Sequence, residues 1–126
     1  MKTPHRFARG VRRQPGTMNK TEQAYAQQLD HQQATGAILA WWFEPVTLRL
    51  AKLTRYTPDF LVFRADQSLE FVEVKGHWED DARVKIKCAA EKYPMFLFTA
   101  VKPVAKKYGG GWKSEVFGDE LSERSV

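Results

Sequence analysis

The pattern of apolar and polar residues predicts a helix near the start of the ordered chain. Three apolar side chains recur at the spacing of one helix face: Tyr25, Ala26 and Leu29. Asn19 precedes Glu22 by three residues, which is the pattern of a capping box, and Gly36 is a typical residue for ending a helix. We therefore expect a helix from about Lys20 to Thr35.

Short runs of β-branched and aromatic residues follow, and they predict strands. A second helix is expected from Glu79 or Asp80 to Tyr93, because acidic residues open this segment, Lys92 lies in its last turn and Pro94 closes it. A turn is expected over Ala51 to Arg55, and residues 64–68 suit the link of a hairpin. The predicted strands are Ile38 to Glu44, Val46 to Leu50, Tyr56 to Phe63, Leu69 to Lys75, Met95 to Val101 and Trp112 to Phe117.

This order of elements predicts an α/β (α+β) domain. The strand, helix and strand between residues 69 and 101 form the pattern of a right-handed crossover, and the preceding pair of strands forms a hairpin. A chain of 126 residues supports one hydrophobic core rather than two. We expect a basic tail over residues 1–18, a single domain over 19–117 and a frayed end over 118–126.

The net charge of +5 belongs to the tail and not to the domain. Six of the 20 lysines and arginines lie in the first 20 residues, which hold no acid, so the rest of the chain has 14 basic against 15 acidic residues. We expect a disordered or non-native tail, and a translation start at Met18 is one explanation. The single cysteine, Cys88, excludes an intramolecular disulfide framework and a multi-cysteine zinc site and favours the cytoplasm.

Two acids and a lysine are expected to meet on the hairpin. Side chains two apart share one face of a strand, so Glu73 and Lys75 are neighbours. Asp59 lies on the partner strand, where opposite residues are about 4.5–5.5 Å apart. Two carboxylates at that separation repel unless a cation lies between them, and oxygen ligands suit Mg²⁺ or Mn²⁺. This chemistry favours phosphodiester hydrolysis.

The spacing of these residues resembles the PD-(D/E)XK motif of the restriction-endonuclease-like superfamily. Pro58 and Asp59 are followed after thirteen residues by Glu73, Val74 and Lys75. The sequence around these residues is similar to that of small phage-encoded nucleases and junction-resolving endonucleases. The resemblance implies a mixed sheet flanked by helices, with the site carried by the hairpin. It implies a metal held by Asp59, Glu73 and the carbonyl of Val74, with Lys75 acting on the attacking water.

Two of these assignments have ordinary structural alternatives. Glu22 is the position that matches a further metal ligand contributed by the first helix in such nucleases, and it shares a face with apolar residues; the capping box is the other explanation. The alternative for Glu73 and Lys75 is a solvated ion pair on an exposed hairpin.

Basic residues outside the motif are candidates for gripping DNA phosphates. Arg83 and Lys87 share a face of the second helix, and the segment from Lys102 to Gly111 is basic and rich in glycine. An ordinary solvated helix face and an ordinary charged loop are the alternatives. Glu44 is a further candidate carboxylate. The DNA-contact candidates are Arg83, Lys87, Lys102, Lys106, Lys107 and His77.

The sequence thus predicts a metal-dependent DNA endonuclease with branched DNA, such as a Holliday junction, as its favoured substrate. A homodimer is expected because a junction presents two symmetric strands. A non-catalytic DNA-binding or assembly module with the same fold is the alternative. A sequence-specific restriction enzyme would need more polypeptide to recognise bases.

Overall fold

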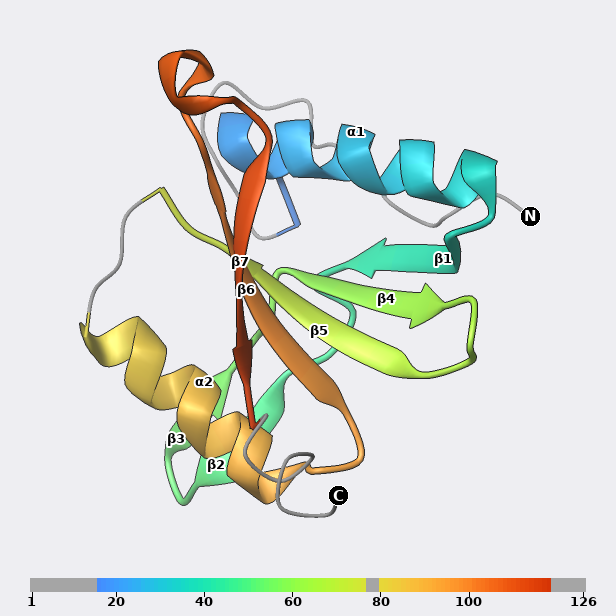
Figure 1. The fold of residues 1–126 in the computed structure, drawn as a ribbon. Helices are drawn as coiled ribbons and strands as arrows, with labels where there is room; N and C mark the ends of the chain where they lie inside the picture. The colour runs from blue at the N-terminus through green and yellow to red at the C-terminus, as the bar shows by residue number, and fades with distance from the viewer. Residues whose placement is uncertain (1–15, 77–79, 119–126) are drawn as a thin grey trace.

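The protein folds into three layers around a mixed β-sheet (Figure 1). The computed structural model describes residues 16–76 and 80–118. Helix α1 (Lys20–Thr35) covers one face of the sheet, and helix α2 (Asp80–Lys92) covers the other together with a small second sheet. The expected α+β class with helices on a central sheet is confirmed.

The main sheet has five strands in the order β1-β4-β5-β6-β7. Only the β5–β6 pair is parallel, and α2 connects these two strands; the other pairs are antiparallel. The β4–β5 pair is the predicted hairpin. The main strands are β1 (Ile38–Phe43), β4 (Phe60–Arg64), β5 (Leu69–Val74), β6 (Leu97–Pro103) and β7 (Trp112–Phe117), while β2 (Leu48–Ala51) and β3 (Thr54–Tyr56) form the small sheet, and a 3₁₀ turn, η1, covers Lys106–Tyr108.

The ends of α1 are fixed by side-chain and glycine caps. The backbone N–H of Glu22 donates to Asn19 Oδ1 at 2.8 Å, and the backbone N–H of Asn19 donates to Glu22 Oε1 at 2.9 Å. Gly36 ends the helix with a left-handed φ of 88°, a conformation that glycine adopts without steric cost. The predicted bounds are confirmed. Neither α1 nor α2 is long and apolar enough to cross a membrane.

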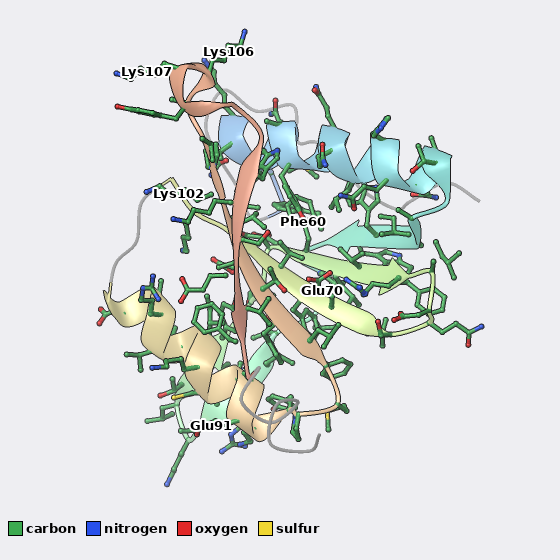
Figure 2. All side chains as sticks on the ribbon, in the orientation of Figure 1. Phe60, Glu70, Glu91, Lys102, Lys106 and Lys107 are labelled. Atoms are coloured by element: carbon green, nitrogen blue, oxygen red, sulfur yellow. The ribbon has the colours of Figure 1, made fainter. Side chains whose placement is uncertain are left out.

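Each face of the sheet has its own apolar cluster. On the α1 face, the buried ring of Phe60 lies 5.4–5.6 Å, centroid to centroid, from the rings of Tyr25, Trp41 and Phe43 (Figure 2). The α2 face buries a second group around Ile86. Burial of aromatic rings on both faces stabilises the strands on which the site depends. The second cluster contains Leu48, Tyr56, Phe71, Ile86, Ala89, Ala90, Phe98, Ala100 and Phe117.

The predicted strand from Tyr56 to Phe63 is wrong in its first half. Tyr56 belongs to β3, and the main strand begins only at Phe60. Pro58 lacks a backbone N–H and so cannot continue a ladder of hydrogen bonds, which separates the two strands. The expected turn over Ala51 to Arg55 is correspondingly shorter, because both ends of that range belong to strands.

The ordered domain begins before Asn19, where the sequence placed its start. Met18, assigned to the tail, is only 2% exposed and packs in the α1-side core. An apolar residue just before a helix cap often packs back on the helix, and the composition of the tail hides this signal. The rest of the tail up to residue 15, and the predicted frayed end from residue 119 onward, lie outside the described residues.

Replacing Phe60 tests this account of the core. Phe60→Ala is expected to lower the free energy of unfolding by about 3–5 kcal/mol, because the ring is fully buried. Met95→Ala, at a side chain that is 68% exposed, should stay within about 0.5 kcal/mol of wild type. Urea unfolding measures both, and a loss below about 1 kcal/mol for Phe60→Ala would contradict the account.

Candidate functional site

The register of the β4–β5 hairpin brings Asp59 and Glu73 together. Phe60 pairs with Val72, so the next position outward places Asp59 opposite Glu73. Asp59 precedes β4, and its carbonyl accepts a hydrogen bond from the N–H of Glu44 at 2.8 Å. Both acidic side chains are buried, each 7% exposed. The predicted convergence of two carboxylates is thus present in the structure.

Glu73 is held from two sides. The hydroxyl of Tyr56 donates to Oε1 at 2.7 Å, and Lys75 Nζ lies 3.0 Å from Oε2. Burial, and then the charge of Glu73, raise the pKa of Tyr56 far above its usual value, so Tyr56 stays protonated and donates. The Lys75 side chain is 29% exposed, and the ion pair with Glu73 therefore lies at the edge of solvent rather than fully on the surface.

Asp59 is strained electrostatically. Its pKa is raised to about 8, first by burial, then by the charge of Glu73 and, to a smaller extent, by the charge of Glu22. The backbone N–H of Val74 donates to Asp59 Oδ2 at 2.8 Å and, together with Lys75, opposes the rise. Within the described part of the chain no hydrogen bond reaches the other oxygen, Oδ1. Asp59 thus has an oxygen available to a ligand and a charge that lacks full compensation.

Glu22 is both a helix cap and a neighbour of the site. Its side chain forms the capping box of α1, as one of the two interpretations predicted. It is buried at 5% exposure, and its charge acts on Asp59. The capping role is confirmed, and the same carboxylate lies near enough to Asp59 for its charge to raise the pKa of Asp59.

A pocket of about 320 Å³ opens beside Glu73 and Lys75. Its walls come from the end of β3, the end of β5 and the first turns of α2. Three cations and two acids line it, and a phosphate group would meet both signs of charge there. The lining residues are Arg55, Tyr56, Thr57, Glu73, Lys75, Asp81, Ala82 and Lys85.

The two α2 candidates for DNA contact lie away from this pocket. Arg83 Nη1 pairs with Glu115 Oε2 at 2.6 Å, and Arg83 and Lys87 line a different hollow beside β7. The helix turns its other flank, with Lys85, towards Glu73.

The β6–β7 candidates divide into two places. Lys102 lies in strand β6 and not in the predicted loop, and it extends on the side where β5 ends (Figure 2). Lys106 and Lys107 project from the turn that connects β6 and β7 (Figure 2). Glu44 Oε1 accepts a hydrogen bond from the N–H of Gly16 at 3.1 Å, and His77 lies outside the described residues.

Sequence reasoning missed two residues of the site, Tyr56 and Lys85. Tyr56 was assigned to the same strand as Asp59, which hid its separate position beneath Glu73. Lys85 was not a candidate, because nothing in the sequence indicates which flank of α2 meets the hairpin. The signal for Tyr56 was Pro58, since a proline there breaks the strand.

A family model matches residues 18–109, and its description is "Protein of unknown function (DUF1064)". The chain belongs to the DUF1064 family. No curated protein and no solved structure matches it. The stretch shared with the DUF1064 model begins at the buried Met18 and contains Glu22, Asp59, Glu73 and Lys75.

The donor set fits a hard divalent cation. Asp59 and Glu73 offer oxygen atoms in a partly buried place. Burial, and then the charge of Glu73, raise the pKa of Asp59, so a nearby cation would stabilise its charged form. Among the described residues no three acidic, histidine or cysteine side chains already form a metal-ligand cluster. A metal would thus rely on the two acids with a main-chain oxygen, or would draw in Glu22.

Stability should depend on pH through Asp59. Its folded pKa lies near 8 and its ordinary value is 3.8, so between these values the folded state keeps a proton that the unfolded state releases, and the free energy of unfolding falls as pH rises. Asp59→Asn removes this pH-dependent loss of stability, because the amide does not ionise. Its side-chain oxygen can still accept the hydrogen bond from the N–H of Val74. In EDTA the variant should melt at least about 4 °C above wild type at the alkaline end of this range, a shift that roughly 1 kcal/mol produces.

The difference between Asp59→Asn and wild type should shrink towards zero at the acid end. Asp66 provides a control of opposite sign, because hydrogen bonds from the side chain and backbone of Ser68 lower its pKa. Asp66→Asn should therefore have a small effect that stays nearly constant across this range and is lost only as pH falls below the ordinary value of 3.8. Thermal melts across this range measure both variants, and an Asp59→Asn effect that does not change with pH would contradict the electrostatic account.

Proposed function

We propose that this protein is a metal-dependent DNA endonuclease of the PD-(D/E)XK, restriction-endonuclease-like kind. The observation that carries the proposal is the buried pairing of Asp59 with Glu73, with Lys75 Nζ 3.0 Å from Glu73 at the mouth of a pocket. The five-stranded mixed sheet with a helix on each face is compatible with that superfamily.

Asp59, Glu73 and the carbonyl of Val74 would hold a Mg²⁺ or Mn²⁺ ion, with Glu22 as a further oxygen ligand. When bound, such an ion supplies Lewis-acid stabilisation of the charge on the phosphate and lowers the pKa of a water. The protein supplies the rest: it fixes both acids on one hairpin and holds them by hydrogen bonds from Val74 and Tyr56.

Lys75 is the group that would act on the attacking water. Its ammonium lies at the edge of the pocket, where it can orient a water towards phosphorus. The water oxygen bonds to phosphorus and releases a proton to solvent, the bond from phosphorus to the leaving 3′ oxygen breaks, and that oxygen takes up a proton from solvent. Tyr56 is a positioning residue, because it fixes one oxygen of Glu73 and leaves Lys75 to pair with the other.

Branched DNA is the proposed substrate, and a homodimer the proposed assembly. A domain of this size offers little surface for recognising a base sequence, and an enzyme that recognises DNA shape needs less. A four-way junction presents two equivalent strands, which two copies of one site would serve. The choice of branched DNA rests on the resemblance of the sequence around the motif to that of junction-resolving nucleases.

One observation favours a non-catalytic DNA-binding module instead. Both oxygens of Glu73 already have protein partners, and the described residues form no complete ligand cluster. In that case no divalent ion would bind at Asp59. Metal binding therefore separates the two functions.

Cleavage tests the enzyme. With Mg²⁺ or Mn²⁺ the protein should cut a labelled four-way junction, and Lys75→Ala should lower kcat by about 10²–10⁴ because it removes the group that acts on the attacking water. Glu73→Gln and Asp59→Asn should reduce cleavage at least as much. Labelled duplex, single-stranded and junction DNA are followed on gels.

Glu70→Gln is the matched control for Glu73→Gln. Glu70 lies on the same strand but on the opposite face, where Arg64 and Thr99 contact it. Its cleavage rate should stay within about threefold of wild type, since the expected loss belongs to the site. Cleavage that survives Asp59→Asn and Lys75→Ala, or cleavage absent with either metal on every DNA, would end the enzyme proposal.

Metal binding should stabilise the fold through the same acids. An ion present at about 100 times its Kd adds about 2.7 kcal/mol to the free energy of unfolding. Mg²⁺ or Mn²⁺ should thus raise the Tm of wild type and of Glu70→Gln, but not of Asp59→Asn. Thermal melts with EDTA and with each metal measure this, and a wild-type Tm that neither metal moves would favour the non-catalytic module.

A further inference from the structure

The small β2–β3 sheet carries an unusual pairing of like charges. We call this two-stranded sheet, residues 48–56, the ribbon. Arg49 and Arg55 are direct cross-strand partners in it. Like charges directly opposite each other destabilise a sheet, so this pair needs a compensating reason. Neither arginine forms an ion pair within the described residues, and both are exposed. The segment 45–58 contains no acidic residue at all.

The ribbon presents its two faces to different surroundings. Leu48 and Tyr56 are buried among the residues of the α2-side cluster, and the hydroxyl of Tyr93 on the α2 side donates to the carbonyl of Arg49 at 2.7 Å. Side chains alternate along a strand, so both arginines point away from this packed face. The apolar face anchors the ribbon, and the basic face is left for a ligand.

The tip of the ribbon is also unusual. Leu53 is 92% exposed and has a φ of 72°, a left-handed conformation that is costly for a branched side chain. Lys52 precedes it. Strained residues of this kind cluster where a protein binds something. An exposed apolar tip beside cations can contact a sugar or a base while the cations meet phosphates.

The ribbon adjoins the candidate site. Arg55 lines the pocket of Glu73 and Lys75, and Lys85 adds a further cation to that wall. From Tyr56 to Leu53 the strand spans about 10 Å at roughly 3.3 Å per residue. That length equals about three steps of the 3.4 Å rise along a DNA strand. Because Arg55 forms part of the pocket wall, a DNA backbone that occupies the pocket would contact the ribbon at Arg55.

We propose that the β2–β3 ribbon is a DNA-binding arm, in which Arg49, Arg55 and Lys52 hold the phosphates that flank the bond cut at the Glu73 pocket. Two-stranded ribbons fit the major groove of a duplex. The inference rests on the proposed function, since it assigns a path to the DNA of that same site. It differs from the sequence-based assignment, which included neither ribbon arginine and placed the phosphate contacts on Arg83, Lys87, Lys102, Lys106, Lys107 and His77.

Binding without cleavage tests the arm. The full chain is titrated in EDTA against fluorescent duplex and four-way junction DNA over a series of salt concentrations. The double variant Arg49→Gln with Arg55→Gln should weaken binding at least about tenfold at low salt, and the slope of log K against log salt should fall by about 2, at roughly 0.9 for each lost phosphate contact. Replacing both arginines by lysine should keep most of the slope.

Arg83→Gln with Lys87→Gln is the matched control. It also removes two positive charges, but from the flank of α2 that faces away from the Glu73 pocket. It should leave the slope nearly unchanged. The ribbon variant should melt at or above the wild-type temperature, since it removes a repulsion, so weaker binding would not reflect unfolding.

The outcomes separate the arm from the enzyme. Wild-type binding by the glutamine ribbon variant, with wild-type cleavage of DNA, would overturn the arm and leave the nuclease standing. Ribbon-dependent binding without any cleavage would support DNA binding by the arm but overturn the nuclease, and with it the assignment of the arm to phosphates beside a cut bond. The absence of DNA binding by wild type would overturn the arm. Competition by polyglutamate that equals competition by DNA and depends on the same arginines would also overturn it, and would point to an acidic protein partner.

Discussion

Phe60 and Val72 lie opposite each other in the β4–β5 hairpin, and this pairing decides both the core and the site. Side chains alternate along each strand, so a slip of one residue would turn Phe60 out of the α1-side cluster and carry Asp59 away from Glu73. The aromatic rings around Phe60 resist such a slip, because it would expose them to water. The hydrophobic core thereby fixes the register that brings the two acids together.

Bringing two carboxylates together in a buried place costs stability, and the surrounding residues offset only part of the cost. Val74 donates to Asp59, while Tyr56 and Lys75 contact Glu73. These contacts leave the pKa of Asp59 near 8, so the cost of burying its charge beside Glu73 is not fully offset. An arrangement that destabilises the free protein and would be relieved by a cation is typical of a functional site rather than of a structural ion pair.

The sequence predicts most clearly the elements whose signals are local. The bounds of α1 follow from Asn19, Glu22 and Gly36, and the hairpin follows from alternating residues. The contact of Tyr56 with Glu73 spans 17 positions and depends on a second sheet, so no local pattern indicates it. Which flank of α2 meets the hairpin is likewise set by tertiary packing, and for this reason Lys85 was not singled out.

Pro58 separates the ribbon from the main sheet but also ties it closely to the acids. Only Tyr56, Thr57 and Pro58 lie between Arg55 and Asp59, and the proline ring limits the rotation of this short link. Tyr56 packs under α2 while its hydroxyl holds Glu73, so the link is fastened at its middle as well. A tilt of the ribbon would accordingly be transmitted through these three residues to Asp59 and Glu73. Movement of the ribbon and the position of the two carboxylates are thus mechanically coupled.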